Sequence, residues 1–177
     1  DSSTIIIKQS SSFKVTDFNI TGLKDVFFGR VDKGIVIIES GKIAKKNDGS
    51  MIIELPTMTL EVKGTRFNIV NNPDGTSEVS LAEDSFGNVG TISIASAGEV
   101  KTLFETEQVI SVNAETGISE RPKTDDEKKE LVDVSNDLIE ASTIDENAIQ
   151  KNLEEKLLNG SLLDANGDGV IDVSDIN

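Results

Sequence analysis

Residues 55–70 read LPTMTLEVKGTRFNIV, a stretch that predicts two β-strands joined by a tight bend. Polar and apolar residues alternate over residues 57–63, which is the period of a half-buried antiparallel strand. Residues 67–70 form a second short run rich in β-branched and aromatic side chains. Gly64 lies between the two runs and fits a bulge or tight bend. We expect Phe67 to anchor the core and Arg66 to bind a neighbouring carboxylate or carbonyl.

Similar strand signals occur on both sides of this stretch, through residue 122. Six more runs are short and rich in β-branched or aromatic residues: 5–7, 26–28, 35–38, 51–53, 91–94 and 109–112. Turn residues that tolerate positive φ stand between runs, at 32–34, 47–49, 73–75 and 86–88. Strand signals at this spacing predict a mainly β fold, an antiparallel sandwich or roll, with a β-solenoid as the alternative.

The composition changes after Pro122, where we predict a domain boundary. Residues 1–122 hold 17 acidic and 12 basic residues and all seven Phe, whereas residues 123–177 hold 15 acidic and 5 basic residues and no aromatic residue. Residues 123–160 predict a small, acidic helical appendage of two amphipathic helices. Capping boxes open both, Thr124 with Glu127 and Thr143 with Glu146. Their apolar stripes need to pack on each other, on the β unit or on a partner chain.

Residues 161–177 contain the stretch DANGDGVIDVSD, which has the spacing of an EF-hand calcium loop. Counted from Asp164, oxygen-bearing side chains fall where a twelve-residue loop needs them, and Gly169 permits the sharp turn. The expected Ca²⁺ ligands are Asp164, Asn166, Asp168, the carbonyl of Val170, Asp172 directly or through water, and Asp175.

The loop is similar to those of dockerin and related secreted calcium-binding segments, which commonly close with Asp. A complete dockerin has two such loops and this stretch supplies one, so the resemblance does not extend to cohesin binding. We expect an extracellular type of affinity, on the order of 10⁻⁴ to 10⁻³ M. A site of that affinity is filled outside the cell and empty in cytosol, which favours an extracytoplasmic protein.

The β unit resembles the FecR domain family. The resemblance is carried by residues 41–43, 55–67 and 74–79 and by a pair of glycine-turned strands within 93–112, and it covers about residues 1–112. Its sharpest motif is Gly64, Thr65, Arg66 and Phe67, which we interpret as a fold-specifying corner. The resemblance implies an all-β extracytoplasmic domain. Some members relay a surface signal through the periplasm to a sigma-factor system, and others are modules of secreted or surface proteins.

Composition excludes several chemistries. The 177-residue chain has no Cys, His, Trp or Tyr, so triads with His, Cys nucleophiles and His or Cys zinc sites are ruled out. Its net charge of -15 argues against binding to nucleic acid or to anionic membranes, and no apolar run is long enough for a membrane helix. Catalysis would require paired carboxylates. The candidates Glu83 and Asp84 fit solvated charges in a turn better.

These observations together predict a non-catalytic, extracytoplasmic binding or structural module of a bacterial exported or surface protein, stabilised at its C-terminal end by Ca²⁺. The expected partner is another protein or another domain of a larger chain. The alternative is a periplasmic signal-relay domain of the FecR type, which would regulate an anti-sigma and sigma-factor system through contact with a receptor.

Overall fold

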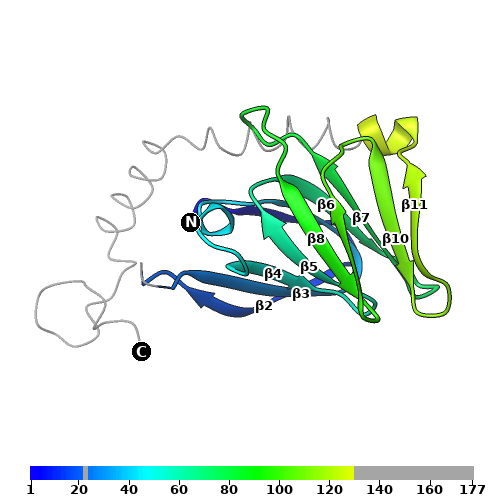
Figure 1. Ribbon diagram of the computed structural model, residues 1–177, viewed down its shortest axis with the longest axis horizontal. Helices are drawn as coiled ribbons and strands as arrows, with labels where there is room; N and C mark the ends of the chain where they lie inside the picture. Colours follow the sequence, from blue (N-terminus) through cyan, green and yellow to red (C-terminus); the bar gives the residue numbers. More distant parts are fainter. Residues whose placement is uncertain (22–23, 130–177) are drawn as a thin grey trace, which may run out of the picture. The chain divides into compact units, whose positions relative to one another are not determined.

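The computed structural model describes residues 1–21 and 24–129, drawn in colour in Figure 1. These residues form a mainly β fold, as predicted. The elements are β1 (Thr4–Ile7), β2 (Ser12–Asn19), β3 (Val26–Glu39), the short 3₁₀ helix η1 (Ile43–Lys45), β4 (Met51–Glu54), β5 (Thr59–Lys63), β6 (Arg66–Asn71), β7 (Thr76–Ala82), β8 (Thr91–Ser96), β9 (Glu99–Leu103), β10 (Gln108–Asn113) and β11 (Gly117–Pro122).

The long strand β3 belongs to both layers of a curled sheet. Its first half pairs with β2 and β4, and its second half pairs with β1 and β6. The first layer continues from β4 through β5 and β8 to β9, and the second continues from β6 through β7 and β10 to β11. In Figure 1, β2, β3 and β4 run along the lower edge while β10 and β11 stand at the right. The β3–β4 pair is parallel, and the other strand pairs of the described residues are antiparallel. Antiparallel pairing of this kind is that of a sandwich or roll and excludes the β-solenoid.

The predicted turn at residues 32–34 is wrong. These residues lie inside β3, so the two runs predicted on either side of them are parts of a single strand of 14 residues. Gly34 has a φ of 83°, in the left-handed region that glycine tolerates. At this point β3 bends from the first layer into the second instead of reversing direction.

One hydrophobic cluster fills the space between the layers. Leu60 and Val62 of β5 point into it, while Thr59 on the same strand is exposed, which is the alternation expected of a half-buried strand. From the other layer, Phe67 and Ile69 of β6 are fully buried in the same cluster.

The start of the predicted helical segment adjoins the sheet. Residues 125–129 are helical, and the predicted capping box is confirmed, with the Thr124 amide donating to Glu127 Oε2 at 2.7 Å and the Glu127 amide donating to Thr124 Oγ1 at 3.3 Å. Lys123 is buried, and its ammonium group donates a hydrogen bond to the carbonyl of Leu81 on β7. The rest of the predicted helical segment lies outside the described residues. Among the residues that are described, no helix has the length and apolar character needed to cross a membrane.

Candidate functional site

The predicted motif forms the corner at which the chain passes from the first layer to the second. β5 ends at Lys63 and β6 begins at Arg66, so Gly64 and Thr65 alone make the connection. Gly64 adopts a φ of 61°. Gly90 lies so close to this bend that an added Cβ would stand 2.1 Å from the Lys63 carbonyl oxygen and 2.2 Å from that of Gly64. The corner therefore needs glycine at two positions far apart in the sequence, one for its conformation and one for its lack of a side chain.

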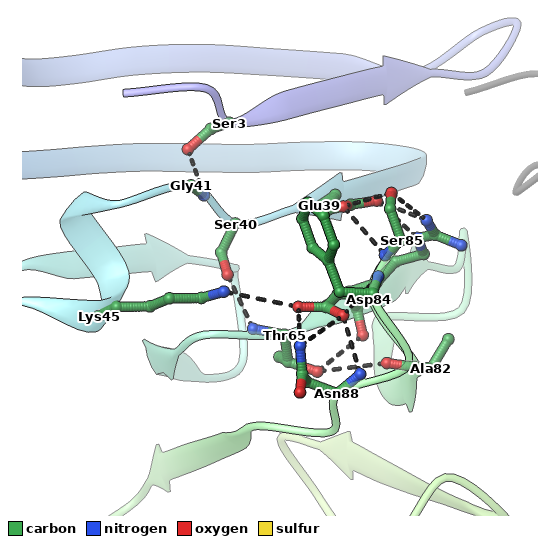
Figure 2. Close-up of polar contacts among 12 residues, drawn as sticks. Ser3, Glu39, Ser40, Gly41, Lys45, Thr65, Ala82, Asp84, Ser85 and Asn88 are labelled. Carbon is green, nitrogen blue, oxygen red and sulfur yellow. Dashed lines mark hydrogen bonds and ion pairs between the residues drawn. The ribbon is translucent and has the colours of Figure 1, made fainter. Parts of the chain in front are cut away.

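Thr65 ties the corner to the end of β3. Its amide donates to Ser40 Oγ at 2.8 Å, and its carbonyl accepts from the Ser40 amide at 3.0 Å. The threonine hydroxyl lies 3.3 Å from the carbonyl of Ala82 at the end of β7 and donates to it (Figure 2). Because Thr65 is almost fully buried, these bonds satisfy polar groups that water cannot reach.

Arg66 pairs with the carboxylate of Glu39, the kind of partner that the sequence predicts. Its Nε lies 3.0 Å from Glu39 Oε2, and its Nη2 donates to the same oxygen and, at 3.1 Å, to Ser85 Oγ. The Arg66 side chain is 3% exposed and that of Glu39 is 14% exposed. Burial favours a raised pKa for Glu39, but hydrogen bonds from Ser85 and Arg66 outweigh burial and leave its pKa below the usual value. Glu39 is therefore an ionised carboxylate. It is held in place by the guanidinium group of Arg66 and by the amide and hydroxyl groups of Ser85.

The sequence predicts that Asp84 is a solvated charge in a turn, and this prediction is wrong. Its side chain is 4% exposed, and Oδ1 accepts the amides of Phe86 at 2.9 Å and Asn88 at 2.8 Å. Burial alone would raise the pKa of Asp84, but these amides, the Asn88 side chain and Lys45 lower it overall. Glu83, the other half of the proposed pair, is exposed.

These bonds fix the conformation of residues 83–90, which we call the corner loop. Ser85 is tied to Glu39 through its amide at 3.2 Å and its hydroxyl at 2.6 Å, and the Asp84 amide donates to the Asn88 carbonyl at 2.9 Å. Figure 2 shows Ser85 joined to Glu39, and Asp84 joined to Asn88 and to Lys45. Phe86, within the same loop, is 84% exposed, and Val89 is 41% exposed. A rigidly held loop thus presents an aromatic side chain to solvent.

A cavity of about 450 Å³ adjoins the corner loop. It is lined by Ala44, Lys45, Lys46, Asn47, Asp48, Lys63, Gly64 and Asn88. The stem of Lys45 crosses Gly64, with Cγ 3.0 Å from where a Cβ would stand at that glycine. Sequence reasoning missed this cavity, although the basic run KIAKK at residues 42–46 is a visible signal in an acidic chain.

A larger cavity of about 650 Å³ lies at the bend of β3 and includes Ile35, Pro56 and Val70 in its lining. Its buried amide, Asn71, already donates to the Asp32 carbonyl at 2.6 Å and accepts from Ser77 Oγ at 3.0 Å. The side-chain amide of Asn71 is therefore already hydrogen-bonded within the protein and is not available to a ligand.

The predicted calcium ligands, Asp164, Asn166, Asp168, Val170, Asp172 and Asp175, lie outside the described residues. Within residues 1–21 and 24–129, no group of three or more acidic side chains is placed to hold a metal ion.

Comparisons with known proteins bear on the fold. No protein-family model matches the chain, and no match was found among curated proteins. A crystal structure from Parabacteroides distasonis, described as a "putative anti-sigma factor", matches with a TM-score of 0.52 at 17% identity, over 68% of this chain and 51% of that chain. A second crystal structure with the same description and organism matches with a TM-score of 0.46 at 16% identity, over 68% of this chain and 60% of that one. The chain thus spans about half the length of the first of these proteins and shares its fold.

Proposed function

We propose that this chain is a non-catalytic binding module of an exported bacterial protein, and that it contacts its partner through the corner loop. The proposal depends on how the motif residues are placed. Gly64, Thr65 and Arg66 stabilise the corner and the neighbouring loop, and that loop exposes the side chain of Phe86. Rigid, exposed aromatic side chains are typical anchors of protein interfaces, because little conformational entropy is lost when they bind.

The two buried carboxylates of the site support a structural role. A general acid at neutral pH needs a raised pKa, whereas donor groups lower the pKa of both Glu39 and Asp84. Each carboxylate is ionised and saturated by donors of its own chain. We therefore assign them to holding the loop and not to proton transfer.

The binding role can be tested by affinity capture from a bacterial periplasmic extract with the full chain as bait. We expect a captured protein that is lost with Phe86→Ala and retained with Phe104→Ala. Phe104 is a matched control because it is also a well-exposed phenylalanine, 61% exposed, but lies outside the corner loop. Equal capture by both variants would refute a role for the loop.

We further propose that residues 164–175 bind Ca²⁺ and that the protein acts outside the cytoplasm, as the resemblance to FecR domains and to secreted calcium loops implies. Four carboxylates in twelve residues repel one another without a cation, so binding and ordering of this segment should be linked. Calcium would then order the segment after Gly160 and leave the β unit unchanged.

Calorimetric titration with Ca²⁺ tests this part of the proposal. Binding should be seen with the wild-type chain, be lost with Asp164→Ala, and persist with Asp137→Ala, which removes a carboxylate outside the loop. EDTA should increase protease cleavage after Gly160 without lowering the melting temperature of the β unit. Titration without heat, or equal heat from wild type and Asp164→Ala, would refute the site.

A second candidate function is signal relay to a sigma-factor system, favoured by the fold shared with the "putative anti-sigma factor". This role predicts that the captured partner is the periplasmic domain of an outer-membrane receptor, bound for example by strand addition at a sheet edge. Capture of a secreted or surface component instead, with no receptor fragment, would favour the module.

A further inference from the structure

Strand β2 forms an edge of the first layer and pairs with β3 alone among the strands that the structure describes. It lies at the lower edge of the sheet in Figure 1. Residues 14–21 are all exposed, and among them Val15, Phe18 and Ile20 are 46%, 51% and 52% exposed. An edge strand of eight residues that exposes apolar side chains is a ready site for pairing with the strand of another chain.

A β-bulge at Thr16 decides which side chains of β2 share a face. Val15 and Asp17 pair with consecutive residues of β3, so Thr16 is an extra residue between them. In a regular strand, residues three apart point to opposite faces, but one extra residue brings them to the same face. Lys14 and Asp17 therefore share a face of β2. Their partners on β3 are two residues apart, which agrees with this arrangement.

Phe13 and Phe18 share the other face of β2 for the same reason. Both contact the ring of Phe27 on β3, with ring centroids 6.5 Å away for Phe13 and 5.9 Å away for Phe18. Phe27 is buried, whereas Phe18 is half exposed. The row of aromatic side chains that begins in the core thus ends in solvent at the edge of the sheet.

The two charges of β2 are not used within the described part of the chain. Neither Lys14 nor Asp17 forms an ion pair with another residue among 1–21 and 24–129. A lone lysine on an edge strand keeps identical chains apart, because like charges at opposed positions destabilise strand pairing. A lysine and an aspartate placed symmetrically about the bulge instead face each other when the strand meets an antiparallel copy of itself.

We propose that β2 pairs in antiparallel fashion with β2 of a second copy of this chain, about a two-fold axis that passes through the bulge. In this register Lys14 of each copy faces Asp17 of the other, and Phe13 faces Phe18. The Cβ atoms of opposed residues lie about 5 Å apart, which allows both the charge pairs and the ring contacts. A second copy is the occupant because one register satisfies the charges and the aromatic side chains together.

The overall charge of the chain sets the conditions under which this dimer forms. The net charge of -15 repels two copies at long range. At physiological ionic strength, exposed charges more than about 8 Å apart are largely screened, whereas the opposed charges between the two strands are closer than that. The proposed contact includes no residue of the corner loop, so its failure would leave the proposed function unaffected.

The test is sedimentation equilibrium of the full chain at physiological salt, where we expect a reversible monomer–dimer equilibrium. Lys14→Glu and Asp17→Lys should each weaken dimerisation roughly tenfold, because each places like charges opposite one another at two positions. These substitutions change the net charge in opposite directions, so a loss in both is not an effect of net charge. An equimolar mixture of the two variants should recover the wild-type affinity, because opposite charges then face each other again.

The matched controls are Lys42→Glu and Glu115→Lys, which reverse exposed charges outside β2. Each should leave the dimerisation constant within about twofold of the wild-type value. Three outcomes would overturn the inference: a monomer at millimolar chain concentration, dimerisation that is unchanged in both β2 variants, and a mixture of those variants that dimerises no better than either alone. The first would leave the edge of β2 to a strand of another protein, and the second would place the contact on a different surface.

Discussion

Two arginines of the β unit join strands to neighbouring segments, and they do so in different surroundings. Arg66 joins β6 to Glu39 of β3 and to the corner loop, and both charged side chains are largely buried, 3% and 14% exposed. Arg121 joins β11 to Glu78 of β7 and to Glu127 of the helical turn, with distances of 3.1 and 2.7 Å. There the arginine is 36% exposed and the glutamates are 17% and 28% exposed.

The comparison indicates that burial, not the type of bond, decides what an ion pair does. Removing one partner of a buried pair leaves the other charge without compensation, so such a pair strongly selects the conformation that keeps it intact. A partly exposed pair is hydrated when it opens and contributes less to stability. We therefore assign the Arg66 pair to specifying the corner and the Arg121 pair to attaching the helix start to the sheet.

The largest effect is expected for Arg66→Met. The substitution leaves Glu39 buried beside Ser85 without its cation, and we expect the free energy of unfolding to fall by about 4 kcal/mol in urea denaturation. Adding Glu39→Leu should recover part of that loss, because the double variant buries no charge. A loss below about 1 kcal/mol would show that the Arg66 pair behaves like an exposed pair. Burial would then not distinguish the Arg66 pair from the Arg121 pair.

The corner illustrates how much the sequence predicts. The bend at Gly64 and the cores of β5 and β6 follow from alternation and glycine chemistry, which are local signals. Glu39 could not be assigned as the partner of Arg66, because 27 residues separate them and the β3–β6 pairing that joins them is a long-range contact. The burial of Asp84 was missed for a different reason. Its amide donors, Phe86 and Asn88, are only two and four residues away, but they are aimed at the carboxylate by the conformation of the loop and not by its composition.

Other differences arise where sequence signals are ambiguous. Strands β2 and β11 carry many exposed and polar residues, so their hydrophobic pattern is weak. The bend in β3 contains the same residue types as a turn, and the sequence does not distinguish a bend from a reversal. The burial of Lys123 over β7 also has no local sequence signal, because the residues that follow it are mostly charged.

The corner can be tested a second way with Gly90→Ala, for which we expect a loss of about 3 kcal/mol. The added Cβ would overlap two backbone carbonyl oxygens, which cannot move without displacing the corner. Gly98→Ala is the matched control, because its φ of 83° imposes conformational strain of about 1 kcal/mol in open space. Equal urea midpoints for the two variants would mean that the corner yields to the extra atom and is not rigid.

The buried Lys123, at the start of the helix, predicts a dependence of stability on pH. Burial lowers the pKa of Lys123 from 10.5 to about 8, against the opposing effects of Glu107 and Glu127. The unfolded chain then holds this proton up to about pH 10.5 and the folded chain releases it near pH 8, so the free energy of unfolding should rise across this window, by an amount on the order of 2 kcal/mol.

The measurement is urea denaturation between pH 8 and 10.5, and Lys123→Met should remove the rise. Few other groups titrate between pH 8 and 10.5. The chain has no Tyr, Cys or His, so only other lysines and the amino terminus remain. Lys14→Met, which changes an exposed lysine of β2, should keep the wild-type slope. A slope shared by all three proteins would contradict the assignment of the rise to Lys123.

The smallest effect is expected for Glu127→Gln, which weakens the attachment made by Arg121. Hydrogen bonding to Arg121 and to Thr124 lowers the pKa of Glu127 from 4.5 to about 2 despite its partial burial. The ionised form therefore stabilises the fold above pH 4.5, and this contribution is lost as the pH falls from 4.5 to 2. Because the group is partly exposed, solvent screening limits the contribution to about 1 kcal/mol.

We expect the stability difference between wild type and Glu127→Gln to be greatest at neutral pH and to vanish near pH 2, with Glu115→Gln at the exposed β10–β11 turn as the control. Arg66→Met should differ from wild type by several-fold more at neutral pH, because its partner Glu39, 14% exposed, is largely shielded from water. If the Glu127 difference instead stays constant down to pH 2, the capping hydrogen bonds and not the charge hold the helix start. The two arginines would then differ in mechanism as well as in burial.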